Sequence, residues 1–391
     1  MTHHAERDRP HPGTLRELAL LFLRLGSTAF GGPAVHIAML HDEVVTRRRW
    51  MDEPEFLDLM GATNLIPGPN STEMAIHVGL ARARWKGLIV AGVSFVLPAM
   101  LIVLALAWSY VRFGTTPAGE SLLYGISPVV IAVVLQALGK LGRTAVKRSP
   151  LLVAVGVAAF TLYLIGVNEL VVLFGGGLVV LLLRGVPGLG HGSVAGLLAI
   201  GPAFLPLPAT LVDPPNVELG KLFLLFLKFG AVVFGSGYVL LAFIRGDLVH
   251  GLGWLTERQL VDAIAVGQLT PGPLFTTATF IGYVLAGLPG AILATVGIFL
   301  PGFVFVACLQ PLVRAVRRHE WTGDLLDGVN VGALGLMAGV TWQLARAAIV
   351  DVPTAVLGLV AAILLLRFRV NSAWLVLGGA VVGLLVHPYV G

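Results

Sequence analysis

Long apolar stretches separated by short polar loops dominate the hydrophobic pattern of this chain. Helix-length apolar runs lie at residues 87–108, 122–139, 151–166, 170–183, 193–205, 291–312, 325–344, 353–366 and 372–386. Continuous apolar runs of this kind are typical of membrane helices. The pattern therefore predicts an all-α, polytopic integral membrane protein.

Two helix breaks interrupt the pattern at related places. Residues 64–73 read N-L-I-P-G-P-N-S-T-E, and residues 268–277 read Q-L-T-P-G-P-L-F-T-T. Sliding the chain against itself by 204 positions pairs these breaks together with many residues before them. The matched pairs include Gly26/Gly230, Phe30/Phe234, Trp50/Trp254, Asp58/Asp262, Pro67/Pro271, Gly68/Gly272, Pro69/Pro273 and Thr72/Thr276. The chain thus contains an internal duplication.

The duplication suggests a division of the chain into two transporter repeats. We expect a polar, cytoplasmic N-terminal segment over 1–14, a first repeat over 15–205 and a second over 219–391. The proline-rich stretch 206–218 is the expected linker between them.

Charge placement predicts how the repeats face the membrane. Arginine and lysine flank the first broken unit, at residues 47–49 and at 82, 84 and 86, whereas the second broken unit has glycine-rich flanks without Lys or Arg. A helix over 53–66 would be about 21 Å long, too short to cross about 30 Å of hydrocarbon, which predicts re-entrant hairpins. Five crossings between the two units, and the opposite charge asymmetry, predict inverted repeats with a cytoplasmic N-terminus.

Composition agrees with this class. The chain is 57% hydrophobic and 12% charged, with a mean hydropathy of +0.89. Its net charge of +5 does not indicate nucleic-acid binding, because Lys and Arg cluster between apolar runs, as the positive-inside rule describes. The single cysteine, Cys308, excludes a disulfide framework or a cysteine-ligated metal cluster within the chain.

The broken helices are the candidate substrate site. A helix that begins inside the membrane presents unpaired backbone N–H groups and a positive dipole end, which favour an anion. We predict that the breaks and their glycine-rich counterparts bind substrate through small or polar residues. These residues are Gly31, Gly32, Asn64, Gly68, Asn70, Ser71, Gly235, Ser236, Gln268, Thr270, Gly272 and Thr276.

Two cations lie inside otherwise apolar helices at matching positions of the repeats. Arg24 and Lys228 are predicted to contribute positive charge to a doubly charged oxyanion, since buried cations in membrane helices usually have a task. The alternative is that they reach the interface or pair with Glu43 and Asp247, which are also related by the repeat.

A proton-coupling group is predicted near the first break. Glu73 has no carboxylate counterpart in the second repeat, where Thr277 occupies the place given by the 204-residue offset. Glu73, or His36 or His77 nearby, is the candidate to take up a proton as the anion leaves. The alternatives are a capping-box role for Glu73 with Asn70, and structural hydrogen bonds for the histidines.

The sequence lacks the common catalytic and cofactor-binding motifs, so it does not indicate an enzyme. The sequence has no H-E-x-x-H, G-x-S-x-G, Walker or dinucleotide-binding pattern, and no cofactor or metal is expected. A membrane enzyme that acts on a phosphorylated lipid, held by Arg24 and Lys228, is the alternative from another class.

The motifs together resemble the long, two-domain form of the chromate ion transporter family. They are F-G-G-P-A-V-H-I-A-M at 30–39, F-L-D at 56–58, G-A-T-N-L-I-P-G-P-N-S-T-E at 61–73, F-G-S-G-Y-V at 234–239, Q-L-T-P-G-P at 268–273 and T-T-A-T-F-I-G-Y at 276–283. The resemblance implies export of chromate across the bacterial inner membrane, driven by the proton gradient, and hence chromate resistance. A sulfate-type importer or an anion channel is the alternative within transport. A homodimer is compatible with the sequence, which does not determine the oligomeric state.

Overall fold

The computed structural model describes residues 14–30, 32–146, 149–184, 217–234, 237–316, 320–368 and 370–389, and every regular element in them is helical. The first half contains α1 (Thr14–Thr28), α2 (Pro33–His41), η2 (Asp42–Arg47), α3 (Glu53–Thr63), α4 (Asn70–Phe113), α5 (Pro117–Ala145), α6 (Pro150–Leu164) and α7 (Glu169–Arg184). The second contains α9 (Leu219–Val232), α10 (Leu240–Ile244), η4 (Arg245–Gly251), α11 (Glu257–Leu269), η5 (Leu274–Thr276), α12 (Thr277–Val316), α13 (Glu320–Ala348), α14 (Val352–Arg367), α15 (Ser372–Val386) and η6 (His387–Tyr389). The expected span 193–205 and residues 206–216 of the linker lie outside the described residues.

The two halves repeat the same order of elements. A first helix, α1 or α9, is followed by a short α-helix that ends in a π-helical turn, then by a short helix before the break, α3 or α11. Side chains cap both of those short helices: Asp52 accepts a hydrogen bond from the Glu55 amide, and Thr256 forms a full capping box with Gln259. α3 ends at Thr63, which is earlier than the expected 53–66.

α4 is two helical segments that fold back on each other. The backbone leaves the helical region at Ala83 and Arg84, where Arg84 has a φ of 52°. Gly79 and Gly87 face each other across this turn, and a Cβ on either glycine would overlap the carbonyl oxygen of the other. The absence of side chains therefore allows the two backbones to touch, and the expected helix over 87–108 is one arm of a hairpin.

α12 repeats this hairpin with a register change of one residue. Its non-helical residues are Ala286 and Gly287, and Gly282 and Gly290 make the close contact. These positions match α4 at an offset of 203, not 204, so the second repeat has one residue fewer after its break. The 3₁₀ turn η5 occupies that place, and 3₁₀ backbone rises about 2.0 Å per residue, so fewer residues cover the distance. Thr72 and Thr276 still correspond, because their amides donate to the carbonyls of Pro69 and Pro273, so the pairing of Glu73 with Thr277 stays a prediction.

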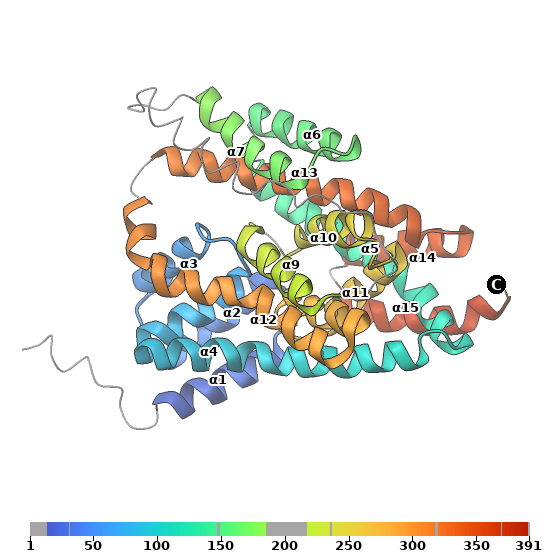
Figure 1. The fold of residues 1–391 in the computed structure, drawn as a ribbon, viewed down its shortest axis with the longest axis horizontal. Helices are drawn as coiled ribbons and strands as arrows, with labels where there is room; N and C mark the ends of the chain where they lie inside the picture. The colour runs from blue at the N-terminus through green and yellow to red at the C-terminus, as the bar shows by residue number, and fades with distance from the viewer. Residues whose placement is uncertain are drawn as a thin grey trace, which may run out of the picture.

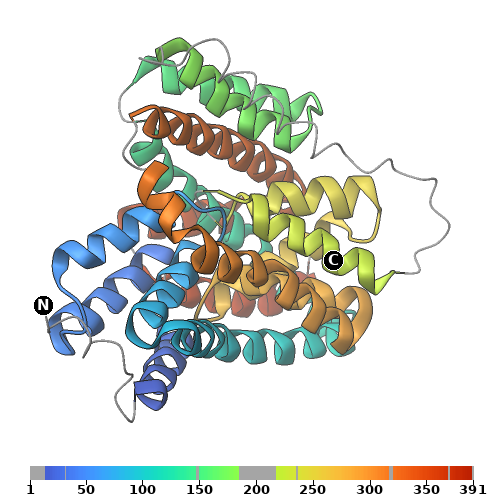
Figure 2. The same cartoon turned by 60° about the vertical axis from the view of Figure 1, so that its left-hand side comes forward.

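The last helices of each half pack on the other half. α6 and α7 lie against α13, and α14 and α15 lie against α5, as both views show (Figures 1 and 2). Glycines again permit close approach at matching points: Gly125 of α5 meets Gly379 of α15, and Gly176 of α7 meets Gly328 of α13. The repeats are therefore interlocked, with α4 and α12 also in contact.

Five helices of the described residues are long and apolar enough to cross a membrane: those at Asn70–Phe113, Pro117–Ala145, Leu274–Cys308, Trp321–Ala348 and Ser372–Tyr389. α6 and α14 are shorter apolar helices. This confirms an all-helical, multi-pass membrane protein.

Candidate functional site

The two Pro-Gly-Pro breaks are bonded reciprocally to the opposite repeat. The amide of Gly68 donates to the carbonyl of Val233 at 2.8 Å, and the amide of Gly272 donates to the carbonyl of Ala29 at 3.0 Å. Both glycines have positive φ, 135° for Gly68 and 90° for Gly272, a backbone that side chains disfavour. Each break is thus held against the end of the first helix of the other repeat, and its amide is paired, as an apolar environment requires.

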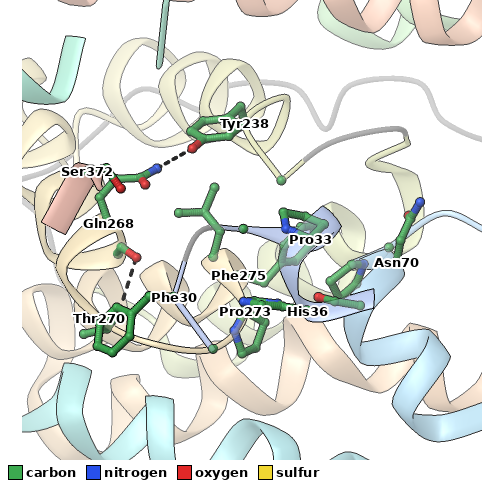
Figure 3. Close-up of a pocket in the computed structure, with 18 residues that line it drawn as sticks. Phe30, Pro33, His36, Asn70, Tyr238, Gln268, Thr270, Pro273, Phe275 and Ser372 are labelled. Atoms are coloured by element: carbon green, nitrogen blue, oxygen red, sulfur yellow. Dashed lines mark hydrogen bonds between the residues drawn. The ribbon is translucent and has the colours of Figure 1, made fainter. Parts of the chain in front are cut away.

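A central cavity lies between the breaks and takes its walls from both repeats (Figure 3). Its lining residues are Phe30, Gly32, Pro33, His36, Gly68, Pro69, Asn70, Ser71, Gly237, Tyr238, Gly267, Gln268, Thr270, Gly272, Pro273, Leu274, Phe275 and Ser372. Eight of the residues predicted from the sequence line it together. These are Gly32, His36, Gly68, Asn70, Ser71, Gln268, Thr270 and Gly272.

Three α-helices begin at this cavity. Pro33 is the first residue of α2, Asn70 that of α4 and Ser372 that of α15, and all three line the cavity wall. The first N–H groups of a helix have no partner within the helix, and the aligned peptide dipoles make this end positive. Among the described lining residues there is no Asp, Glu, Lys or Arg. The electrostatic character of the cavity is consequently set by helix starts and neutral polar groups, an arrangement that favours an anion.

The polar side chains of the cavity are held in place by hydrogen bonds. Gln268 Nε2 donates to the Tyr238 hydroxyl at 2.7 Å, a bond that Figure 3 shows at one side of the cavity. Thr270 Oγ1 donates to the carbonyls of Val266 and Gly267 at 3.2 and 3.3 Å. His36 Nε2 lies 3.0 Å from the Ala29 carbonyl oxygen. These bonds orient the side chains before any ligand is present.

The remaining residues predicted at the breaks are placed differently. Asn64 lies beside the cavity, where its Oδ1 accepts from Asn70 Nδ2 at 2.9 Å. Thr276 is fully buried, donates to the carbonyl of the lining residue Pro273 and does not itself line the cavity. Gly31, Gly235 and Ser236 lie outside the described residues.

The predicted cations form ion pairs and do not line the cavity. Arg24 Nη2 contacts Glu43 Oε1 at 2.5 Å, and Lys228 Nζ contacts Asp247 Oδ2 at 2.7 Å. The Arg24 side chain is 54% exposed. The pairing alternative raised by the sequence is therefore present in this structure, and a direct role of Arg24 and Lys228 in substrate binding stays a prediction.

Glu73 is buried behind the first break. It is fully inaccessible to solvent, its side chain lies beside Gly68 and Gly302, and neither carboxyl oxygen has a hydrogen-bond partner among the described residues. The expected capping box with Asn70 is not formed, because Pro69 occupies the N-cap position and its carbonyl accepts from the Glu73 amide. His77, one turn further along α4, is also buried.

Two lining residues with polar side chains, Tyr238 and Ser372, were missed by the sequence prediction. Tyr238 directly follows the glycine-rich break of the second repeat, which is the signal that could have identified it. Ser372 begins α15 after Asn371, whose side chain accepts a hydrogen bond from the Ala373 amide. That Asn-Ser pair is a helix-start signal, but its position at the cavity depends on the exchange of α15 between the repeats.

Comparisons with known proteins agree with this architecture. The chromate transporter family, described as "Chromate transporter", matches residues 16–181 and 220–384. The chain is 36% identical to a chromate transport protein of Cupriavidus metallidurans over 96% of this chain and 94% of that protein. It is 33% identical to a probable chromate transport protein of Synechococcus elongatus, with 90% of each chain covered.

A chromate transport protein of Pseudomonas aeruginosa is likewise 33% identical, over 98% of this chain and 95% of that protein. No solved structure shows a significant match. Two matches to the family cover most of the residues, and the named relatives match over nearly their full length. The chain therefore belongs to the chromate transporter family.

Proposed function

We propose that this protein is a secondary transporter that carries chromate, or a closely related tetrahedral oxyanion, across the bacterial inner membrane. The observation that carries the proposal is the convergence of three helix starts on one cavity between the two breaks. Family membership adds the chemical class of the substrate, since the named relatives are chromate transport proteins.

The cavity suits a dianion that must also leave. Backbone N–H groups at helix starts, with Asn70, Ser71 and Gln268, offer hydrogen bonds to four oxygens without a fixed cation among the described lining residues. A site built from partial charges binds an oxyanion less tightly than a buried arginine would. Release to the other side of the membrane is then possible, as transport requires.

The proposed architecture is a pair of inverted-topology repeats over 15–205 and 219–391, with the breaks at the tips of re-entrant hairpins. In support, the later part of α4 runs from left to right in Figure 1, whereas the later part of α12 runs from right to left. Arg82, Arg84 and Lys86 surround the turn of α4, and by the positive-inside rule this supports a cytoplasmic position for that turn and for the N-terminus.

We further propose that transport is export coupled to protons, with Glu73 as the coupling group. A buried carboxylate without a partner is costly, so a proton on Glu73 is favoured until a rearrangement admits water. Its position beside Gly68 connects its charge to the break that contacts the cavity. His36, which lines the cavity, and buried His77 are the second candidates.

Two alternatives remain within transport: a sulfate-type importer and an anion channel. A channel would carry flux that is indifferent to the proton gradient, and an importer would carry it inward. Membership in a transporter family sets aside the enzyme alternative.

The test is uptake of labelled chromate into inverted membrane vesicles that contain the protein, with and without a protonophore and with sulfate as a competitor. Accumulation that the protonophore collapses is expected for a coupled exporter. Vesicles that carry a folded protein but accumulate no chromate would contradict the proposed substrate, and accumulation unaffected by the protonophore would contradict the coupling.

A further inference from the structure

We infer that two repeat-related side cavities are the alternating access routes to the central cavity, and that Asn330 and Ser127 mark equivalent points on them. The inference rests on the proposed transport function. The first vestibule is lined by residues that include Asn64, Asn70, Thr144, Asp327 and Asn330. The second vestibule is lined by residues that include Tyr124, Ser127, Arg258, Asp351 and His387.

The two vestibules use the same positions of the two repeats. Leu326, Asp327 and Asn330 of α13 line the first, and Leu123, Tyr124 and Ser127 of α5 line the second. These triplets are related by the offset of 203 that also relates the hairpins of α4 and α12. The opposite walls correspond as well, since Ala145 lines the first vestibule and Ala348 the second. Equivalent residues of the two repeats therefore form the walls of the two vestibules.

The vestibules lie at opposite ends of the α5–α13 pair. The first takes its walls from the C-terminal part of α5 and the N-terminal half of α13, and the second takes its walls from the N-terminal part of α5 and the C-terminal end of α13. α5 and α13 run in opposite directions in Figure 1. A route through each vestibule would consequently reach the central cavity from a different face of the membrane.

The first vestibule adjoins the central cavity and the second does not. Asn70 lines both the first vestibule and the central cavity, and Val239 of the first vestibule directly follows Tyr238 of the central cavity. Among the described lining residues, the second vestibule has none in common with the central cavity. Between them lies α11, which lines the second vestibule with Arg258 and the central cavity with Gln268.

The equivalent helices α3 and α11 also differ in burial, in line with the difference between the two vestibules. The matching residues Asp58 and Asp262 differ: Asp58 is exposed, whereas Asp262 is only 1% exposed and accepts a hydrogen bond from Tyr110 at 2.8 Å. α11 packs against α4, α5, α13 and α15, and the main contacts of α3 are with α4 and α12. The structure is thus the state in which the first vestibule adjoins the central cavity and α11 separates the second vestibule from it.

The vestibules offer donors to a passing anion, and the carboxylates on their walls are engaged. Arg184 contacts Asp327 at 3.2 Å at the first vestibule, and the Tyr124 hydroxyl donates to Asp351 at 2.6 Å at the second. Asn70 and Asn330 carry amide N–H groups on the first route, and Arg258 carries a cation on the second. An oxyanion therefore meets hydrogen-bond donors on both routes.

Cysteine accessibility tests this assignment on the full chain. The native cysteine Cys308 is exposed, so the background is Cys308→Ser. Single variants Asn330→Cys, Ser127→Cys and the central reporter Ser71→Cys are treated with a membrane-impermeant maleimide in inverted and in right-side-out vesicles. Thr270→Cys replaces Ser71→Cys as reporter where the latter is not inserted in the membrane.

We expect Asn330→Cys and Ser127→Cys to react from opposite faces. The central reporter should react from the Asn330 face about tenfold faster than from the Ser127 face, because a minor conformer is populated at about 10% or less. Reaction of both vestibule cysteines from one face, or of the central reporter from the Ser127 face first, would overturn the inference.

This readout does not use chromate, so its outcome is independent of the substrate assignment. Addition of chromate then separates the vestibule assignment from the substrate assignment. Protection of the central reporter by chromate supports the proposed function. Labelling from the expected faces without protection supports the vestibules but contradicts chromate as the ligand.

Tyr110→Phe tests the closure by α11. It removes the hydrogen bond to buried Asp262 of α11, so α11 should move away from its place between the second vestibule and the central cavity more often. Labelling of the central reporter from the Ser127 face should then rise about tenfold. Tyr389→Phe, at a tyrosine that is 89% exposed, is the matched control. Equal labelling in both variants would contradict the role of this bond.

Discussion

Glu73 is the residue whose surroundings bear most directly on energy coupling. It lies on the first turn of α4, fully buried between the first break and Gly302 of α12. In the second repeat, Thr276 and Thr277 donate their hydroxyls to the carbonyls of Pro273 and Leu274 at 2.8 and 2.7 Å. The two repeats therefore differ in chemistry here, because the first carries a carboxyl group that can exchange a proton and the second carries hydroxyl groups that are already bonded.

Glu73→Gln tests this asymmetry. Glutamine has the shape of the protonated carboxyl but cannot release a proton, so accumulation driven by the proton gradient should be lost while gradient-independent exchange of the anion continues. The measurement is labelled-chromate uptake with and without a pre-loaded anion. Glu120→Gln, at an exposed position, is the control and should behave as the parent protein. Full gradient-driven accumulation by a well-expressed Glu73→Gln protein would remove Glu73 from the mechanism.

The pair Lys228–Asp247 distinguishes an ion-pair role from direct binding of substrate. Both side chains are about one-third exposed, so the pair contributes about 0.2–1 kcal/mol to stability. Lys228→Asp places two carboxylates together and should lower both stability and transport, and the exchanged double variant with Asp247→Lys should restore both. Thermal unfolding in detergent and chromate uptake are measured on each protein. A folded double variant without transport would favour the direct contact predicted from the sequence.

Residue chemistry was predictable where it depended on the chain nearby. The cavity is lined by Gly68, Gly272 and Ser71 because a Pro-Gly-Pro break ends one helix and lets another begin. This break can be read directly from the sequence. Ser372 reaches the same cavity only through the packing of a distant helix, so no local pattern could place it there. Arg24 lies in an apolar helix, but its exposure depends on neighbours that sequence alone does not reveal.

At the scale of elements, the hairpins of α4 and α12 depend on glycine pairs. In α4, a methyl group on Gly79 would overlap the carbonyl oxygen of Gly87, which belongs to the backbone and cannot rotate away. The matching contact between Gly282 and Gly290 shows that the geometry is required twice. Small residues at helix contacts are the general means by which membrane helices approach closely.

Gly79→Ala should destabilise the protein by about 1–3 kcal/mol, because the two segments of α4 must separate. The control is Gly139→Ala in α5, where an added Cβ meets no atom within 4 Å. That variant should be neutral or more stable by about 0.5–1 kcal/mol, since alanine favours the helix. The measurement is the midpoint temperature of thermal unfolding of the two purified variants. Equal midpoint temperatures for Gly79→Ala and Gly139→Ala would contradict the proposed packing.

Element boundaries were predictable to the extent that caps and breaks mark them. Asp52 and Thr256 are the N-caps of α3 and α11, and residues of this type before a helix are a signal that the sequence carries. The register change between the repeats was not predictable. The ungapped overlay of the sequence ends near Thr72, and a 3₁₀ turn leaves no signal in the composition. The turn at Arg84 has a positive φ in a residue that rarely adopts it, so propensity would have argued against it.

At the scale of the whole molecule, the exchange of helices makes the halves mutually dependent. α6 and α7 cover α13, α14 and α15 cover α5, and the breaks are bonded across the repeats at Gly68 and Gly272. Hydrophobic periodicity indicates that a helix has a buried face but not which helix covers it. This is why the duplication could be identified from the sequence whereas the interlocking could not.

The interlocking predicts the behaviour of a split protein. With the chain divided within residues 206–215, each half alone would leave the glycine-lined faces of α5 or α13 uncovered, together with an unpaired break amide, so each half should be degraded or aggregated. Co-expression of the two halves should restore a stable complex and chromate uptake, because the contacts between halves do not require a continuous chain. Co-purification and vesicle uptake provide the readouts, with the intact chain as reference. A half that is monodisperse and stable by itself would show that its helices can cover one another, and would contradict the exchange.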